Sequence, residues 1–210
     1  MTCSAAAAAQ IPYYAPAVGH GNLNGYTSLK FRPGVAAKET YTSFQFGLSD
    51  YAAAGVDLQT CGSEVYGGII ARGGYEFSPR FGVGLQLTPS FRVDGNMEFS
   101  YLTTGLFFSG DIISDKRFFW AANTWYTASR HAADDIEQYL YLGSTLPLPH
   151  GQTITPMLGT IYSWRLDSSA DIAAGAYWTV GKFCFYLWAN DLLKAHPRFV
   201  VGLEFTIPAL

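Results

Sequence analysis

Hydrophobic and polar residues alternate along residues 80–93, RFGVGLQLTPSFRV. Phe81, Val83, Leu85 and Leu87 fall on one parity, while glycine, glutamine, threonine and serine occupy the other. A period of two predicts a β-strand whose two faces meet different surroundings. The second face lacks the Lys and Glu of a water-exposed sheet and is typical of a crowded or water-filled interior. The pattern therefore favours an arrangement in which the bulky apolar face points outward.

Similar segments recur along the chain and are separated by turn signals, with hardly any helical periodicity. Most are 10–13 residues long, close to the ~9–11 residues that a tilted strand needs to cross a bilayer. No domain boundary interrupts them. Twelve strands are predicted, at about residues 25–31, 40–48, 53–60, 65–77, 81–92, 97–108, 117–128, 136–146, 152–164, 170–180, 183–190 and 198–207.

The composition favours a membrane protein that crosses with strands. Of the 210 residues, 49% are hydrophobic and only 14% are charged, against roughly 25% charged in average soluble domains. No apolar run approaches the ~20 residues of a transmembrane helix. We therefore predict an all-β fold, a closed antiparallel up-and-down transmembrane β-barrel of about 12 strands. A soluble all-β barrel that binds a small hydrophobic ligand in its interior is the alternative.

Two features do not follow the simple pattern. Pro89 and Pro156 lie inside predicted strands, where each removes a ladder donor, so each should mark a bulge or lie near a rim. The strands at 97–108 and 183–190 are apolar on both parities. They either face lipid on one side and an N-terminal plug on the other, or belong to a soluble core. Residues 191–196 could form one helical turn.

The chain divides into two parts. Ala5 to Ala9 followed by Gln10 resembles the end of a secretory signal peptide, without the basic and apolar regions that normally precede it. A disordered alanine-rich tail is the alternative. We assign residues 1–24 to a signal remnant with a lead-in segment and residues 25–210 to the barrel.

The last strand, RFVVGLEFTIPAL, resembles the C-terminal strand of bacterial outer-membrane β-barrel proteins. Phe199, Val201, Leu203, Phe205 and Ile207 share one parity. The resemblance implies the porin-like class, a bacterial outer-membrane location, periplasmic termini, and two partners, the lipid bilayer and the outer-membrane assembly machinery. Such strands usually finish on an aromatic residue, whereas this chain continues to Leu210.

Nothing in the sequence predicts covalent chemistry. The four histidines lie in predicted loops, the three cysteines match no zinc pattern, and neither His-x-Ser nor Gly-x-Ser-x-Gly occurs. A Cys61–Cys184 bridge is possible, although Cys184 reads more simply as a wall residue. The net charge of −3 gives no basic footprint for nucleic acid. We expect no enzyme, no cofactor, no metal and no nucleic-acid partner.

The candidate site is the inward face. Charged groups avoid the lipid side of a barrel, so polar side chains of the strands should point into the lumen. Arg72, Gln86 and Asn123 lie near strand centres and are candidates for a constriction; lumen hydrogen bonds that merely fill the barrel are the alternative. The predicted function is a narrow porin-like channel for small polar solutes, or a structural outer-membrane protein. The candidate pore-lining residues are Arg72, Gln86, Asn123, Glu98, Arg92 and Glu204.

Overall fold

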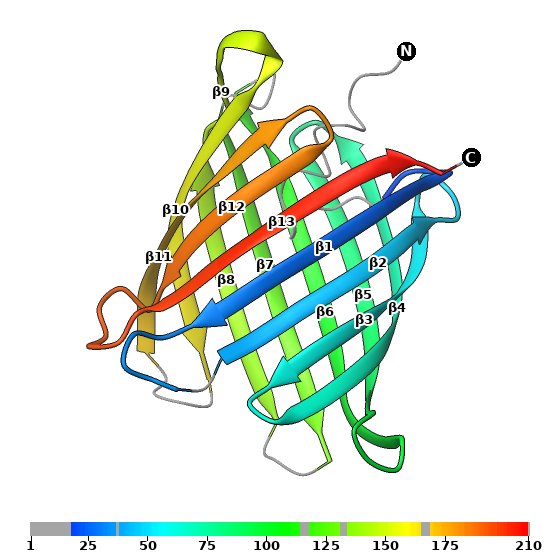
Figure 1. Cartoon of the computed structure of the whole chain (residues 1–210). Coiled ribbons are helices and arrows are strands. Elements are labelled where there is room, and N and C mark those ends of the chain that lie inside the picture. Colours follow the sequence, from blue (N-terminus) through cyan, green and yellow to red (C-terminus); the bar gives the residue numbers. More distant parts are fainter. Residues whose placement is uncertain (1–17, 37, 114–117, 131–133, 165–168, 210) are drawn as a thin grey trace.

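A computed structural model describes residues 18–36, 38–113, 118–130, 134–164 and 169–209. Almost all of these residues lie in β-strands, which form one sheet (Figure 1). The strands are β1 (Asn22–Phe31), β2 (Lys38–Gly47), β3 (Ala52–Cys61), β4 (Glu64–Ser78), β5 (Phe81–Arg92), β6 (Glu98–Ile113), β7 (Phe118–Ser129), β8 (Asp135–Gly143), β9 (Leu146–Pro147), β10 (Thr153–Ser163), β11 (Ser169–Val180), β12 (Phe183–Asn190) and β13 (Arg198–Pro208).

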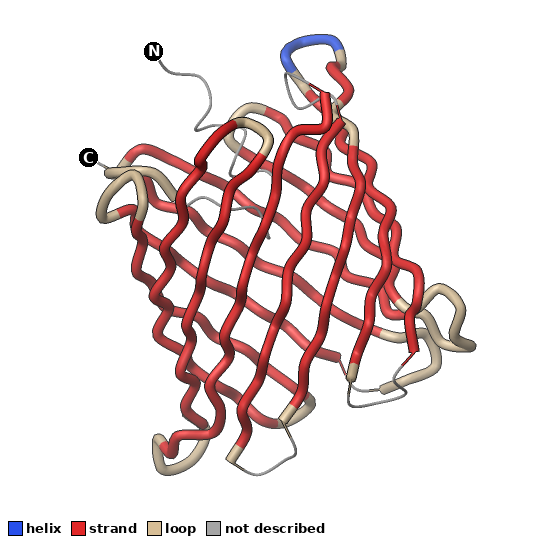
Figure 2. Tube along the Cα trace, turned by 180° about the vertical axis from the view of Figure 1, so that it is seen from behind, coloured by secondary structure: helices blue, strands red, loops and turns tan. Residues whose placement is uncertain are grey.

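The sheet closes on itself. Except for β8 and β9, which do not pair with each other, consecutive strands pair antiparallel, and β13 returns to pair with β1 from Asn22↔Pro208 to Phe31↔Phe199. The short β9 pairs with β10 just beyond the end of β8. β8 and β9 therefore share one position in the wall, which has twelve strand positions, called staves here. Figure 2 shows the steep tilt of these staves from the other side. The predicted closed antiparallel barrel is therefore confirmed.

The two ends of the barrel differ in what they carry. The start of β1 and the end of β13 lie at the same end, which we call the terminal end. The β9 hairpin, with the 3-10 turn Pro149–Gly151, projects from this end (Figure 1). The opposite end, called the far end, carries the connections after β1, β3, β5 and β12. A single axis thus runs from the terminal end through the lumen to the far end.

The alternation in β5 answers the question of which face points outward. Leu85 and Leu87 are 45% and 40% exposed on the outside, whereas Gln86 and Thr88 are buried in the interior. The same holds around the barrel, since large apolar side chains such as Leu158 are exposed outward. The bulky apolar side chains of this parity therefore cover the exterior, which suits acyl chains. The interior holds polar groups together with a buried cluster that includes Met157, Ile161 and Trp188.

Both strand prolines occupy places where the ladder is already irregular. Pro89 precedes a register shift between Ser90 and Phe91 in the β5–β6 pairing. Pro156 lies on β10 opposite the gap between β8 and β9, and its carbonyl accepts a hydrogen bond from the Ser144 amide. The bulge next to Pro89 falls between Ser90 and Phe91, where β6 carries the extra residue Ser100, and Pro156 lies opposite a break between its partner strands.

Two local predictions were wrong. β6 continues to Ile113, well beyond the predicted end at residue 108. Residues 191–196 form no helix; Asp191 adopts a left-handed backbone conformation (φ 57°), and only the Lys194 amide donates back to the Asp191 carbonyl. Among the described residues, no helix is long and apolar enough to span a membrane.

The lead-in reaches the barrel through a close backbone contact. The proposed signal remnant at Ala5 to Ala9 lies outside the described residues, and the first strand begins at Asn22. The Gly21 amide donates to the Gly47 carbonyl, and a Cβ at Gly47 would lie 1.7 Å from the Gly19 carbonyl oxygen. Only glycine allows this approach. This contact holds residues 18–21 against the last residue of β2, Gly47, at the terminal end of the barrel.

Candidate functional site

The interior contains a cavity of about 270 Å³. Every long strand except β10 contributes to its wall, so the cavity belongs to the barrel as a whole. Val18 of the lead-in also lines it. The aromatic lining residues are Tyr26, Tyr41, Tyr101, Trp125, Tyr139, Tyr141, Tyr177, Tyr186 and Trp188.

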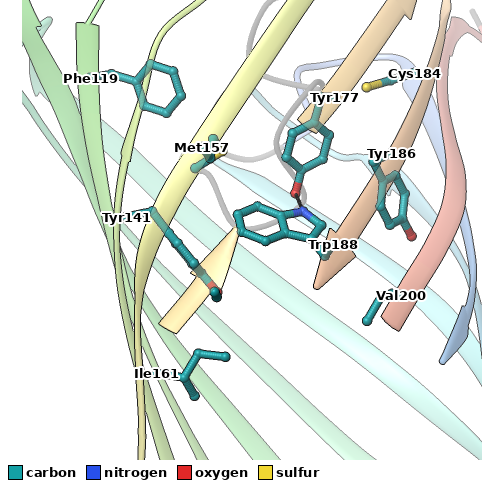
Figure 3. Packing of buried hydrophobic residues seen from close by; sticks show 10 residues of the cluster. Phe119, Tyr141, Met157, Ile161, Tyr177, Cys184, Tyr186, Trp188 and Val200 are labelled. Carbon is teal, nitrogen blue, oxygen red and sulfur yellow. Dashed lines mark hydrogen bonds between the residues drawn. The ribbon is translucent and has the colours of Figure 1, made fainter. Parts of the chain in front are cut away.

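Seven of these rings form a continuous series along the inner wall, which we call the aromatic belt. Successive ring centroids are 4.9–5.9 Å apart, within the range of favourable aromatic contacts. In Figure 3 the Trp188 indole lies between Tyr141 and Tyr177 and donates a hydrogen bond to the Tyr177 hydroxyl at 2.8 Å. In order along the wall, the belt comprises Tyr139, Tyr141, Trp188, Tyr177, Tyr186, Tyr26 and Tyr41.

Glycines on the inner wall let two of these rings lie flat against the backbone. A Cβ at Gly175 would come within 2.3–2.7 Å of three atoms of the Trp188 six-membered ring. A Cβ at Gly202 would lie 2.1 Å from the Tyr186 hydroxyl oxygen. The missing side chains leave space for the rings. The Trp188 indole thus covers Gly175 and also lines the cavity.

The wall formed by β13, β1 and β2 is polar. The Asn24 amide donates to Glu204 Oε1 at 2.8 Å, and Tyr26 lies directly opposite Glu204 in the β1–β13 register. Glu204 Oε2, Gln45 Oε1 and Ser28 Oγ are buried and have no hydrogen-bond partner among the described residues. Buried polar atoms are nearly always hydrogen-bonded to protein, water or ligand. These atoms line the cavity and can bind what enters it.

The charges of the lining balance. Three cationic side chains and three carboxylates face the cavity, so their formal charges sum to zero. Arg198 lies 4.0 Å from Glu137, and the Tyr41 hydroxyl donates to Asp57 at 3.0 Å. The six charged residues are Lys30, Arg72, Arg198, Asp57, Glu137 and Glu204.

Three of the predicted pore residues come together in the cavity lining: Arg72, Gln86 and Glu204. Arg72 pairs in register with Gln86, and its guanidinium lies over the Phe107 ring, 5.0 Å from the centroid. Asn123 also points inward and is 2% exposed, but it is not among the residues that line the cavity; in register it lies between Phe107 and Tyr139.

The other two predicted residues, Arg92 and Glu98, lie at the far-end rim. Arg92 forms ion pairs with Glu64 (2.9 Å) and Asp94 (2.8 Å), and Glu98 pairs with Arg130 at 2.6 Å. The hydrogen bond from Arg92 lowers the pKa of the Asp94 carboxyl below its usual value of 3.8. These ion pairs are exposed to solvent at the rim, away from the cavity, and each contributes little to stability.

Sequence reasoning missed the aromatic belt. The signal was the doubly apolar strand at 183–190, whose inner parity supplies Cys184, Tyr186 and Trp188 to the lumen wall. Neither a plug nor a soluble core is needed to explain this pattern. Cys184 is a buried wall residue whose sulfur accepts a hydrogen bond from the Thr179 hydroxyl, and neither it nor Cys61 forms a disulfide among the described residues. Among the described residues, no group of three or more His, Cys, Asp or Glu could hold a metal ion.

The sequence matches no protein-family model and no curated protein. Solved structures share its architecture. It is similar to the KdgM porin with a TM-score of 0.63 at 10% identity, covering 87% of this chain and 98% of that one. For the NanC porin the TM-score is 0.56 at 11% identity, with 86% and 98% covered. For the β domain of the Bordetella autotransporter BrkA it is 0.51 at 12% identity, with 88% and 99% covered. The chain thus has the fold of outer-membrane β-barrels and resembles the small porins among them.

Proposed function

We propose that this protein is a narrow channel for small polar solutes in a bacterial outer membrane. The observation that carries the proposal is the closed barrel with an apolar exterior and a polar interior cavity. A barrel of twelve staves lies between the side-chain-filled eight and the open sixteen. The fold it shares with two porins supports the same function.

Arg72, Gln86 and Glu204 form the constriction in this proposal. Arg72 and Gln86 come from the adjacent strands β4 and β5, Glu204 comes from β13, and all three line the cavity. Asn123 points inward without lining the cavity, whereas Arg92 and Glu98 act at the far-end mouth. Since the lining charges balance, ion selectivity should be weak. Transport through such a site requires no covalent step.

The lipid bilayer and the assembly machinery are the proposed partners. The exposed outer face carries bulky side chains such as Ile69 and Leu187, which acyl chains would cover. The strand β13, whose alternation resembles an assembly signal, is also the strand that closes the barrel onto β1. We infer that insertion and closure involve the same strand.

Conductance in planar bilayers tests the channel. The full chain, folded in detergent and checked by heat-modifiable gel migration, should insert and give discrete steps of small conductance. Heat-unfolded protein is the control. Correctly folded protein that inserts without any conductance would contradict the channel and leave a structural role in the membrane.

A further inference from the structure

We propose that the lumen holds a binding site for a neutral sugar, with a pyranose ring stacked on the aromatic belt and its hydroxyls bound by the polar wall at the β13–β1 seam. This proposal rests on the proposed channel and names the class of solute. A second structure of the KdgM porin is a complex with disordered oligogalacturonate. An acidic ligand of that kind is a different chemical class from the one inferred for this lumen.

The belt supplies an apolar surface of the required shape. Tyr26 and Tyr186 stack on each other with ring centroids 5.5 Å apart and planes inclined by 14°, and both rings line the cavity. The Trp188 indole covers Gly175 and also lines the cavity. A pyranose has faces made of C–H groups, which pack on aromatic rings, and a rim of hydroxyls that seeks hydrogen bonds.

The polar wall supplies the complementary hydrogen-bonding groups. Glu204 Oε2, Gln45 Oε1 and Ser28 Oγ have no partner among the described residues, and all three residues are more than nine-tenths buried. Each residue lines the cavity. A ligand rich in hydroxyls can donate to these oxygens, whereas an anion would meet a carboxylate and an amide oxygen.

The register places the two kinds of group side by side. Tyr26 lies opposite Glu204 across the seam, and Ser28 lies opposite Gly202, over which the Tyr186 hydroxyl rests. A hydroxylated ring packed against the Tyr26–Tyr186 stack would therefore have the Glu204 carboxylate and the Ser28 hydroxyl nearby.

Size and charge agree with this class of ligand. A cavity of about 270 Å³ lies near the lower end of the roughly 300–1,000 Å³ typical of small-molecule sites, enough for about one or two sugar rings. The lining has no excess of positive charge to favour an acidic sugar, since Lys30, Arg72 and Arg198 are matched by three carboxylates. The site therefore favours a neutral ligand.

Calorimetric titration of the full chain in detergent micelles tests the site with three probes. Cellobiose is neutral and has ring faces, digalacturonate has ring faces and charge, and sorbitol has hydroxyls without a ring. Cellobiose should bind saturably and at least tenfold more tightly than either other probe. Equal or tighter binding of digalacturonate, or the absence of saturable cellobiose binding, would overturn the proposal.

Two variants and a matched control test whether cellobiose binds in the lumen. Tyr186→Leu should weaken cellobiose binding roughly three- to tenfold through loss of the stacking face. Glu204→Gln should weaken it roughly tenfold, because an uncharged amide accepts a weaker hydrogen bond. Phe185→Leu, a neighbouring aromatic that points outward, is the matched control and should bind as the unaltered chain does. Equal affinities in all three would contradict the assignment to the belt.

The outcome for the sugar site can be separated from that for the channel. Conductance without cellobiose binding would refute the sugar site and leave the channel intact. Cellobiose binding without conductance would support the site and contradict the channel. If Tyr186→Leu fails the gel-migration test of folding, Tyr26→Leu replaces it, and the titration of the unaltered chain still decides the proposal.

Discussion

Tyr26 of β1 stacks on Tyr186 of β12 although β13 lies between them. The contact is possible because the position of β13 between the two rings is Gly202, which has no side chain. The Tyr186 hydroxyl reaches over it to donate to the Thr27 carbonyl at 3.1 Å. These contacts connect β1 to the side chain of Tyr186 on β12, two strands away, across the seam where the barrel closes.

Gly202→Ala should destabilise the seam. Its Cβ would lie 2.1 Å from the Tyr186 hydroxyl oxygen and 2.3 Å from the Thr27 carbonyl oxygen, and the second atom belongs to the ladder and cannot swing away. Overpacking of this kind lowers the free energy of unfolding by about 1–3 kcal/mol. The midpoint temperature for loss of the folded band in gel migration should fall. Gly95→Ala, which meets nothing within 4 Å, is the control, and equal midpoints for the two variants would contradict the close packing.

An arginine on the outer face should be far more costly than one on the inner face of the same strand. Leu87 is 40% exposed outward near the middle of β5, and the adjacent Thr88 is buried inside, where its side chain and the Asp57 carboxylate both lie over Gly68. Leu87→Arg should reduce the stability of the membrane-inserted barrel by about 2–4 kcal/mol, since the charge enters the hydrocarbon region. Thr88→Arg should retain most of the stability, because its charge lies near Asp57. Denaturant titration in lipid vesicles measures both; if Leu87→Arg is as stable as Thr88→Arg, the exterior does not face lipid.

Charge reversal should affect ion selectivity at the cavity more than at the rim. Arg72 lines the cavity, whereas Arg92 is half-exposed at the far end and paired with Glu64 and Asp94. Arg72→Glu should shift the reversal potential in a salt gradient toward cation preference. Arg92→Glu should shift it less, because solvent and salt screen the rim. An unchanged potential in Arg72→Glu would remove Arg72 from the constriction.

The rim ion pair should be visible in the titration of Asp94. The hydrogen bond from Arg92 lowers the pKa of this carboxyl below 3.8, so its contribution to stability is present above that value and is lost as the pH falls through the lower folded pKa. Carbon-13 NMR titration of the folded protein in micelles measures the shift. Arg92→Gln should return the pKa of Asp94 toward 3.8, and an unchanged titration would mean that the pair does not persist in solution.

The strand pattern, the closed barrel and the outward direction of the apolar residues could all be inferred from the sequence. Alternation is a local property, and the side chains of Leu85 and Gln86 point to opposite faces of any strand. The ends of the strands were harder to predict. β6 extends beyond its predicted end because its last residues pair with β7 at the rim.

The sequence by itself determined the period-two pattern, the twelve strands and the candidate charges of the lumen. Only the tertiary structure decided which of those charges share a cavity and which lie at a rim, because closure and register set the height of each residue on the barrel axis. The aromatic belt likewise exists only in the closed barrel. Its rings come from strands as distant in the chain as β2 and β12, and Gly175 and Gly202 make room for them only once neighbouring staves have paired.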